Sequence, residues 1–168
     1  MLRLVEHTIS MIHRAGFPVS IVSSDPAVTA WGAAHVEHLV PEPSVGGLDG
    51  AALAGVSTAP GPWIVVHADL PALTSKDVAV AARLAGSTTV IAPSRDGGTS
   101  LIGSNVGPQS FSYGPGSFRR HLSATRGRAT ILVRPGLALD LDHPWDLIAL
   151  GRLGYVFGET AEADSRDL

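Results

Sequence analysis

A chain of 168 residues is long enough for one domain with a core of ordinary size, and an apolar content of 45% can supply that core. Charged residues make up only 16%, below the roughly 25% usual in globular domains, so we expect most helices to pack against neighbours. The net charge of −3 gives no basic footprint for nucleic acid or an anionic membrane, and the absence of cysteine excludes disulfides, thiolate metal sites and cysteine nucleophiles.

Apolar spacing and capping residues predict helices and strands in alternation. An amphipathic helix over 2–15 comes first and should end at Gly16. Ser24 or Asp25 is expected to cap the next helix, with Pro26 at its first position. Strands are expected over 18–24, 35–40, 62–68, 87–93 and 99–103. Further helices are expected near 48–54, from a capping box at 74–77 to about residue 84, over 117–124, and from residue 144. Two more segments, 130–135 and 137–142, should be extended.

Strands that alternate with helices indicate an α/β domain with a mostly parallel sheet. No repeat or linker divides the chain, so we expect one domain over 1–158 and a flexible acidic tail over 159–168. No run of 18 or more apolar residues predicts a membrane helix. Glu6 and His7 interrupt the region where a secretory signal would be apolar, so a cytoplasmic protein is the default expectation.

Three aspartates follow segments that should be extended. Asp69 ends the strand over 62–68, and Asp140 and Asp142 alternate with Leu141, so both should point the same way. Ligands of open α/β sheets bind beyond the carboxyl ends of strands, where gathered carboxylates need a cation between them. Mg²⁺ fits because it takes few carboxylates and leaves room for water and phosphates. Taken singly, Asp69 can be a turn-former and Asp142 a helix cap.

Two glycine-rich loops are candidates for holding an anion. The segment "SYGPGSFRRH" over 112–121 places Ser117 as the N-cap of a helix whose first amides point outward, with Arg119 and Arg120 nearby. The segment "DGGTS" over 96–100 presents the hydroxyl of Thr99, which can donate to a phosphate or carboxylate. Either segment can also be an ordinary turn.

The histidines give weaker signals. His67 shares a face with Asp69 and could join it in binding zinc. His121 lies one helical turn beyond the Gly-Pro-Gly turn, within reach of an anion. For these residues, as for His35 and His38, a hydrogen-bonded or surface histidine is the more common case.

Four segments, "DLPALTSKDV", "IAPSRDGGTSLIG", "YGPGSFRRHL" and "PGLALDLDHPWDL", resemble in order and spacing the CofC/FbiD family, the guanylyltransferases of coenzyme F420 biosynthesis. The resemblance runs from about Met1 to about Leu150. It implies a Rossmann-like nucleotidyltransferase fold of the glycosyltransferase-A kind, with a mixed, mostly parallel sheet flanked by helices. It also implies transfer of GMP from GTP to phosphoenolpyruvate or 2-phospho-L-lactate, with release of pyrophosphate. The choice of acid, with 3-phosphoglycerate as a third candidate, stays open, as does a homodimer.

The resemblance assigns roles to single residues. It implies that Asp69 is catalytic. The implied ligands of Mg²⁺ are Asp69, Asp140 and Asp142. The residues that it implies for binding the phosphorylated acid are Thr99, Gly114 and Ser117.

The segment "GGLDGAAL" over 46–53 resembles the family's stretch near the nucleotide, which implicates Gly47 and Asp49, the latter where asparagine is usual. His143 and Trp145 replace the family's common threonine and glutamate, which bears on a helix start more than on the site. The chain begins after the family's first strand and its Lys/Arg loop against the nucleotide phosphates, and Lys76 cannot replace that lysine. Because that strand would be central, we expect unpaired backbone and an exposed apolar face. Either the true start is further upstream, which is our hypothesis, or this form is poorly stable or inactive as a transferase.

Two other functions remain open at this point. A related cytidylyl- or uridylyltransferase would share the fold, although Thr99 and the Gly114–Ser117 turn argue against it. A chain without the phosphate loop could instead be a non-catalytic remnant that binds nucleotide or a partner. Pyrophosphate release with each nucleoside triphosphate separates the three.

Overall fold

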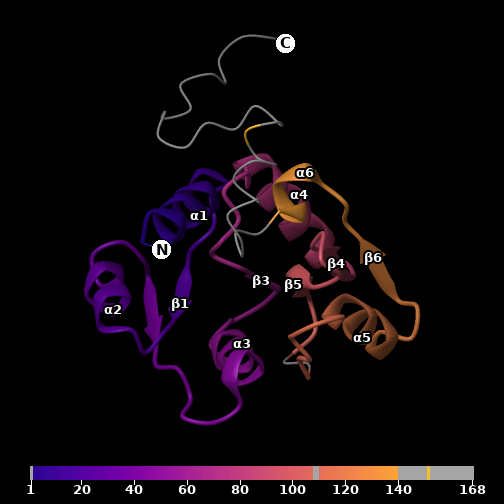
Figure 1. The fold of residues 1–168 in the computed structure, drawn as a ribbon, viewed down its shortest axis with the longest axis horizontal. Coiled ribbons are helices and arrows are strands. Elements are labelled where there is room, and N and C mark those ends of the chain that lie inside the picture. Colours follow the sequence, from indigo (N-terminus) through magenta and orange to yellow (C-terminus); the bar gives the residue numbers. More distant parts are fainter. Residues whose placement is uncertain (1, 108–109, 140–150, 152–168) are drawn as a thin grey trace.

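The computed structural model describes residues 2–107, 110–139 and 151 (Figure 1). Within them, helices and strands alternate along most of the chain. The elements are α1 (Leu2–Arg14), β1 (Ser20–Val22), α2 (Pro26–Gly32), β2 (His38–Val40), α3 (Gly47–Ser57), β3 (Trp63–Val66), α4 (Ser75–Ala85), β4 (Thr89–Pro93), β5 (Thr99–Ser104), α5 (Ser117–Ala124), β6 (Ala129–Ile131) and α6 (Pro135–Ala138).

The strands of the described residues form two sheets. β1 and β2 pair in parallel, and the second sheet has the strand order β3-β5-β4-β6. β5 is antiparallel to β3 and β4, whereas β6 is parallel to β4. The α/β class and a mixed sheet flanked by helices are confirmed, but parallel pairs do not predominate. The reason is the short loop over 94–98, which returns the chain from β4 to β5 without a crossover helix.

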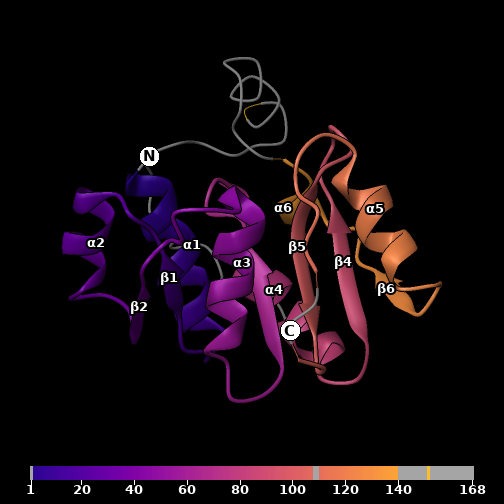
Figure 2. The same ribbon diagram turned by 90° about the horizontal axis from the view of Figure 1, so that it is seen from below.

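Helices cover both faces of the four-stranded sheet (Figures 1 and 2). On one face, Val90, Ala92 and Leu101 join a core built with α1, α4 and α6. On the other face, Ile91 and Ile102 join a core built with α3 and α5. Consecutive strand residues thus enter different cores, which explains why β4 and β5 are apolar without alternation.

The β1–β2 pair lies beside the larger sheet and is not hydrogen-bonded to it in the described part of the chain (Figure 2). α3 contacts both β1 and β3 and so connects the two sheets. Every residue of β5 is buried, whereas Ile64, Val65 and Val66 of β3 are only partly buried. Among the described residues, the strands therefore form two sheets that α3 joins by packing and not by hydrogen bonds.

Capping residues behave as predicted at two helices. Asp25 Oδ1 accepts hydrogen bonds from the amides of Ala27 and Val28 at 2.8 and 3.0 Å, which caps α2. Thr74 and Asp77 form the reciprocal capping box of α4. Local sequence therefore determines where these helices begin.

The prediction of an extended segment over 137–142 is wrong for its first two residues. Pro135 begins the short helix α6, which includes Leu137 and Ala138, because its fixed φ suits a first helical position. The rest of that prediction from Asp140 onward, the helix from residue 144 and the tail over 159–168 lie outside the described residues.

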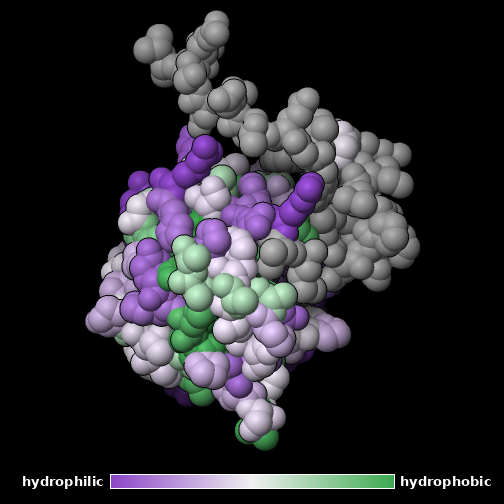
Figure 3. Space-filling model, turned by 90° about the vertical axis from the view of Figure 1, so that its left-hand side faces the viewer, coloured by the Kyte–Doolittle hydropathy of each residue, from purple (hydrophilic) through white to green (hydrophobic). Residues whose placement is uncertain are grey.

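Figure 3 looks onto the left-hand side of Figure 1, where α1, α2 and the β1–β2 pair lie. Apolar residues form a narrow band there between polar ones. Among the described residues, every helix is too short or too polar to span a bilayer.

Candidate active site

Three segments that are distant in sequence meet beyond the end of β3. They are residues 67–69, the loop 94–98 with the start of β5, and the loop over 110–116 that leads into α5. The His67 amide donates to Ser100 O at 3.0 Å, and the Phe118 amide donates to Gly97 O at 3.3 Å. The rings of His67 and Tyr113 lie 5.2 Å apart between centroids. The fold therefore brings the end of β3 and both glycine-rich loops to one place.

Thr99 and Ser117, both predicted to bind the acid, are buried side by side at 2% and 1% exposure. Ser117 Oγ donates to Thr99 Oγ1 at 3.2 Å, and His121 Nδ1 lies 2.9 Å from the same oxygen. The prediction that Ser117 is the N-cap of α5 is wrong. Gly116, at φ 70°, takes that position, and the Ser117 hydroxyl turns inward to Thr99 instead of toward the helix amides.

The turn over 112–116, which contains Gly114, is held by Arg120. The Arg120 guanidinium donates to the carbonyl oxygens of four consecutive residues, Ser112 to Pro115, at 2.6 to 3.3 Å. Gly114 has φ 98°, a conformation that costs little only for glycine. The donors of Arg120 thus stabilise the turn, while its positive charge remains beside Gly114.

Gly47 and Asp49, both predicted to lie near the nucleotide, belong to the start of α3. Asp49 Oδ1 accepts the Tyr113 amide at 2.6 Å, so this carboxylate connects α3 to the 112–116 turn. Gly47 is exposed and has φ 51°, which disfavours any other residue. The structure therefore brings Asp49 to the Thr99–Ser117 centre through the turn and leaves Gly47 at the helix start.

Asp69 lies in the segment after β3 together with His67. Among the described residues, Asp69 Oδ1, His67 Nε2 and Tyr113 Oη are buried without a hydrogen-bond partner. Buried polar atoms without partners are costly, so they mark atoms that are available to a ligand or ion. A carboxylate oxygen suits a hard cation, which makes Asp69 a fitting ligand for Mg²⁺.

The other two predicted metal ligands, Asp140 and Asp142, lie outside the described residues. In the part of the chain that the structure describes, no group of three or more His, Asp or Glu side chains is arranged to share a metal ion. The metal site of three aspartates therefore stays a prediction, as does zinc binding by His67 and Asp69.

Burial controls the protonation of the aromatic groups in this centre. Burial raises the pKa of the Tyr113 phenol, and the nearby Asp49 carboxylate raises it further, so Tyr113 remains a neutral hydroxyl. Burial lowers the pKa of His121. The Asp49 carboxylate raises this pKa, whereas Arg120 and His67 lower it further. Both rings are therefore uncharged at neutral pH.

The loop over 94–98 is held by Asp96. Asp96 Oδ1 accepts from the Ser94 hydroxyl and from the Gly98 amide, the latter at 2.9 Å. The hydrogen bond from the Ser94 hydroxyl has the largest effect on the pKa of Asp96 and lowers it, and the bond from the Gly98 amide lowers it further. This carboxylate fixes the loop that delivers Thr99.

Two features of the centre were missed from sequence. Tyr113 gave no signal as a residue that faces His67. His121 was expected within reach of an anion, but both its nitrogens are already engaged, with Thr99 Oγ1 and with the Ser112 amide, each at 2.9 Å. The spacing of Ser117 and His121, four residues apart on one helix face, could have indicated that they share a partner.

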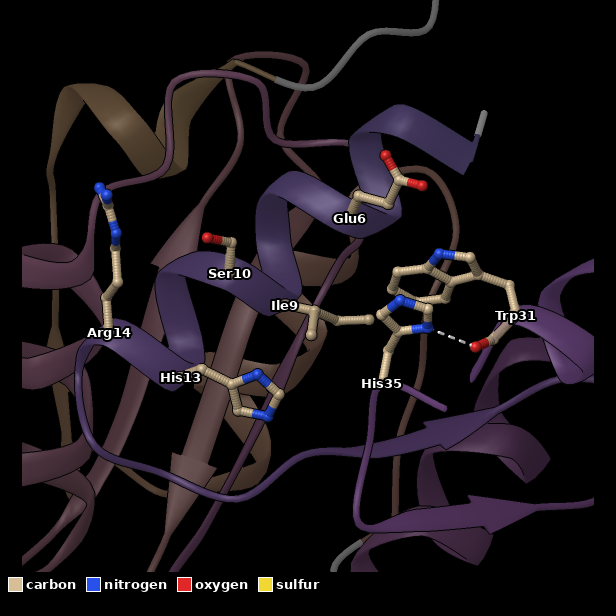
Figure 4. A pocket seen from close by; sticks show the side chains of 7 residues that line it. All are labelled: Glu6, Ile9, Ser10, His13, Arg14, Trp31 and His35. Atoms are coloured by element: carbon tan, nitrogen blue, oxygen red, sulfur yellow. Dashed lines mark hydrogen bonds between the residues drawn. The ribbon is translucent and has the colours of Figure 1, made fainter. Parts of the chain in front are cut away.

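A hollow of about 380 Å³ lies between α1 and α2, on the other side of the molecule from α5 (Figures 1 and 4). His35 stacks on Trp31 with ring centroids 4.2 Å apart, and its Nδ1 lies 2.7 Å from Trp31 O. His35 is thus a hydrogen-bonded histidine. Since none of the predicted site residues lines this hollow, it is separate from the candidate site.

Comparison with solved structures agrees with the observed fold. A crystal structure of a protein described as a nucleotide-diphospho-sugar transferase, from Desulfovibrio desulfuricans G20, superposes with a TM-score of 0.71. The superposition covers 92% of this chain and 74% of that one, at 16% sequence identity. This likeness shows that the two proteins share an α/β fold.

Comparison with curated proteins finds guanylyltransferases. The phosphoenolpyruvate guanylyltransferase of Rubrobacter xylanophilus is 41% identical over 103 residues, which are 57% of this chain and 50% of that protein. The 3-phospho-D-glycerate guanylyltransferase of Phenylobacterium zucineum is 32% identical over 80% of this chain, and the phosphoenolpyruvate guanylyltransferase of Salinispora arenicola is 33% identical over 81%. The chain spans 66% of each of these last two relatives.

The model of one protein family, described as "Guanylyl transferase CofC like", matches residues 3–151. This range contains the end of β3, the two glycine-rich loops and all three aspartates predicted to bind metal. The chain therefore belongs to the family of CofC-like guanylyl transferases.

Proposed function

We propose that this protein is a guanylyltransferase that transfers GMP from GTP to phosphoenolpyruvate and releases pyrophosphate, in the biosynthesis of coenzyme F420 in the cytoplasm. 2-Phospho-L-lactate and 3-phosphoglycerate are the competing acceptor acids. The names of the relatives support phosphoenolpyruvate or phosphoglycerate. The choice of phosphoenolpyruvate follows the relatives from Rubrobacter xylanophilus and Salinispora arenicola.

One structural observation carries the proposal. In a member of this family, the predicted acid-binding residues Thr99 and Ser117 share a buried hydrogen bond of 3.2 Å, and the Ser117 amide donates to Gly114 O at 3.0 Å. Because the Ser117 hydroxyl donates to Thr99 Oγ1, the hydroxyl proton of Thr99 can be donated to the carboxylate or phosphate of a small acid. A glycine with positive φ beside them allows that acid to approach the backbone.

In the proposed reaction, a phosphate oxygen of the acid attacks the α-phosphorus of GTP. A new phosphorus–oxygen bond forms there, and the bond to the β-phosphate breaks in line, so pyrophosphate leaves. Such a transfer depends chiefly on placing two anions and on compensating their charge. Thr99, Gly114 and Ser117 would hold the acid, while Gly47 and Asp49 would lie near the nucleotide.

A divalent cation fits the buried, unpartnered Oδ1 of Asp69. Asp69, Asp140 and Asp142 would hold Mg²⁺. When bound, the ion would offset the repulsion between the two anionic reactants.

The test is pyrophosphate release by the full chain with Mg²⁺. GTP, CTP, UTP and ATP are each combined with phosphoenolpyruvate, 2-phospho-L-lactate and 3-phosphoglycerate. We expect release only with GTP, and the highest kcat/KM with phosphoenolpyruvate. Release with CTP or UTP would instead support the related nucleotidyltransferase, and no release with any pair would contradict the proposal.

A matched pair of variants tests the acid site. Thr99→Val removes the buried hydroxyl and should raise KM for the acid by about tenfold, because a hydrogen bond to a charged group is lost. Thr29→Val makes the same change at an exposed position in α2 and should leave KM unchanged. Equal kinetics of the two variants would contradict the role of Thr99.

A further inference from the structure

His121 is buried at 2% exposure between the Thr99–Ser117 pair and the loop that leads into α5. The backbone amide of Ser112 lies 2.9 Å from His121 Nε2. A backbone amide can only donate, so Nε2 must accept with its lone pair. A neutral imidazole then carries its proton on Nδ1, and the Ser112 amide therefore selects this tautomer.

The second nitrogen contacts the predicted acid site. His121 Nδ1 lies 2.9 Å from Thr99 Oγ1, so the Nδ1 proton is donated to that oxygen. Ser117 Oγ also donates to Thr99 Oγ1, at 3.2 Å. A hydroxyl oxygen has two lone pairs, and both are then occupied. The hydroxyl proton of Thr99 must consequently point toward a third group.

The surroundings of the ring keep it neutral. A proton on Nε2 would face the Ser112 amide proton, and burial opposes a charged ring. The titratable and charged groups around it are Asp49 of α3, His67 after β3, Tyr113 of the loop and Arg120 on its own helix. Burial, Arg120 and His67 lower the pKa of His121, and Asp49 raises it.

We propose that His121 is a positioning residue that, held by the Ser112 amide in its Nδ1-protonated form, directs the Thr99 hydroxyl proton toward the phosphorylated acid. The inference rests on the proposed function and extends it to a residue outside the predicted site. Deprived of the Nδ1 donor, Thr99 could turn its proton toward position 121, and its donation to the acid would be lost.

Two substitutions separate this role from a purely structural one. The amide of His121→Asn reaches the position of Nδ1, so this variant keeps a donor for Thr99 and loses the acceptor for Ser112. The amide of His121→Gln reaches the position of Nε2, so this variant keeps the acceptor for Ser112 and loses the donor for Thr99. His35→Gln, in the hollow between α1 and α2, is the matched control.

The expected result is a split between KM and kcat. His121→Gln should raise KM for the acid by about tenfold, while its KM for GTP and its kcat remain within about twofold. His121→Asn should stay within about threefold of wild type in all three constants, and His35→Gln should match wild type. A KM for the acid that rises more in His121→Asn than in His121→Gln would overturn the proposal, because loop order alone would then explain the role of His121.

A second measurement does not depend on the reaction. Nitrogen-15 NMR of the wild-type imidazole at pH 7 should show His121 with a protonated Nδ1 and an unprotonated Nε2. The opposite tautomer would overturn the proposal even in an active enzyme. If wild type releases no pyrophosphate with any pair of substrates, while the NMR shows the expected tautomer, the proposed function fails and the His121–Thr99 hydrogen bond does not.

Discussion

Asp69 follows an apolar strand, and its Oδ1 is buried with no hydrogen-bond partner among the described residues. Polar atoms in such surroundings are normally paired. The nearby Thr99, Ser117 and His121 show the opposite situation, since their side-chain polar atoms are joined in one network. At the scale of single residues, the centre combines a fixed hydroxyl pair with a carboxylate that is available to an ion.

The first prediction concerns Asp69. Asp69→Asn should lower kcat/KM by about a hundredfold or more, because charge compensation by a metal ion is worth several kcal/mol. The free energy of unfolding should change by less than about 1 kcal/mol, since no hydrogen bond to Oδ1 within the described residues is broken. Steady-state kinetics and urea denaturation measure the two effects. Glu42→Gln, an exposed control, should change neither, and full activity of Asp69→Asn would contradict the metal role.

The second prediction concerns pH. Burial lowers the pKa of His121 in the folded chain, while the unfolded chain takes up this proton near pH 6.5. The stability that depends on neutral His121 is therefore complete above about pH 6.5 and is lost as the pH falls toward the lower pKa of the folded state.

Urea denaturation between pH 7.5 and 5 measures this effect. Wild type should lose stability more steeply than His121→Asn below about pH 6.5, because the other histidines titrate in both proteins. The lowered pKa values of Glu37 and Asp96 act at more acid pH and do not interfere. Parallel curves for the two proteins would show that His121 titrates normally.

At the scale of elements, α6 is anchored on the start of α4. The Asp77 carboxylate, in a residue only 3% exposed, accepts from the backbone and side chain of Thr74 and from Arg134 Nε. A Cβ on Gly136 would overlap Asp77 Oδ2 and lie 2.5 Å from Ala72 O, so α6 can approach this closely only with glycine there. The chain that leads toward Asp140 is therefore fixed against α4.

The third prediction tests this anchor. Arg134→Met removes the partner of a buried carboxylate and should lower the free energy of unfolding by about 2 to 3 kcal/mol, since Asp77 keeps its bonds to Thr74. Arg128→Met makes the same change at an exposed arginine and should change stability by less than about 0.5 kcal/mol. Chemical denaturation measures both, and similar values would contradict a stabilising role for the Arg134–Asp77 pair.

At the scale of the whole molecule, stability is distributed unevenly. β5 is buried along its full length between two neighbours, whereas β1 and β2 are three-residue strands that pair only with each other in the described part of the chain. α3 connects the two sheets and also reaches the site through Asp49. The site thus lies on the larger, better buried sheet.

The fourth prediction follows from this division. Amides of β4 and β5 should exchange with deuterium only through global unfolding, and amides of β1 and β2 should exchange faster through local opening. Hydrogen exchange followed by mass spectrometry at neutral pH measures the difference. Equal protection of the two sheets would show that they unfold as one unit.

The sequence alone determined the α/β class, most helix starts and the residues of both loops, because capping signals, apolar spacing and glycine-rich turns act within a few neighbouring residues. The resemblance carried by four segments also indicated the family that the family model then showed. Thr99 and Ser117 could be named in this way before their contact was known.

Only the tertiary structure decided the direction of β5, the division of the sheet and the partners of Ser117 and His121. The short loop between β4 and β5 allows the two strands to pair as an antiparallel hairpin or to separate without pairing. Burial of both faces of the sheet decides between these outcomes. Ser117 could cap its helix or turn inward, and the nearness of Thr99, 18 residues away in sequence, made the inward bond possible. Such choices depend on which distant segments pack together, and a local pattern carries no information about that packing.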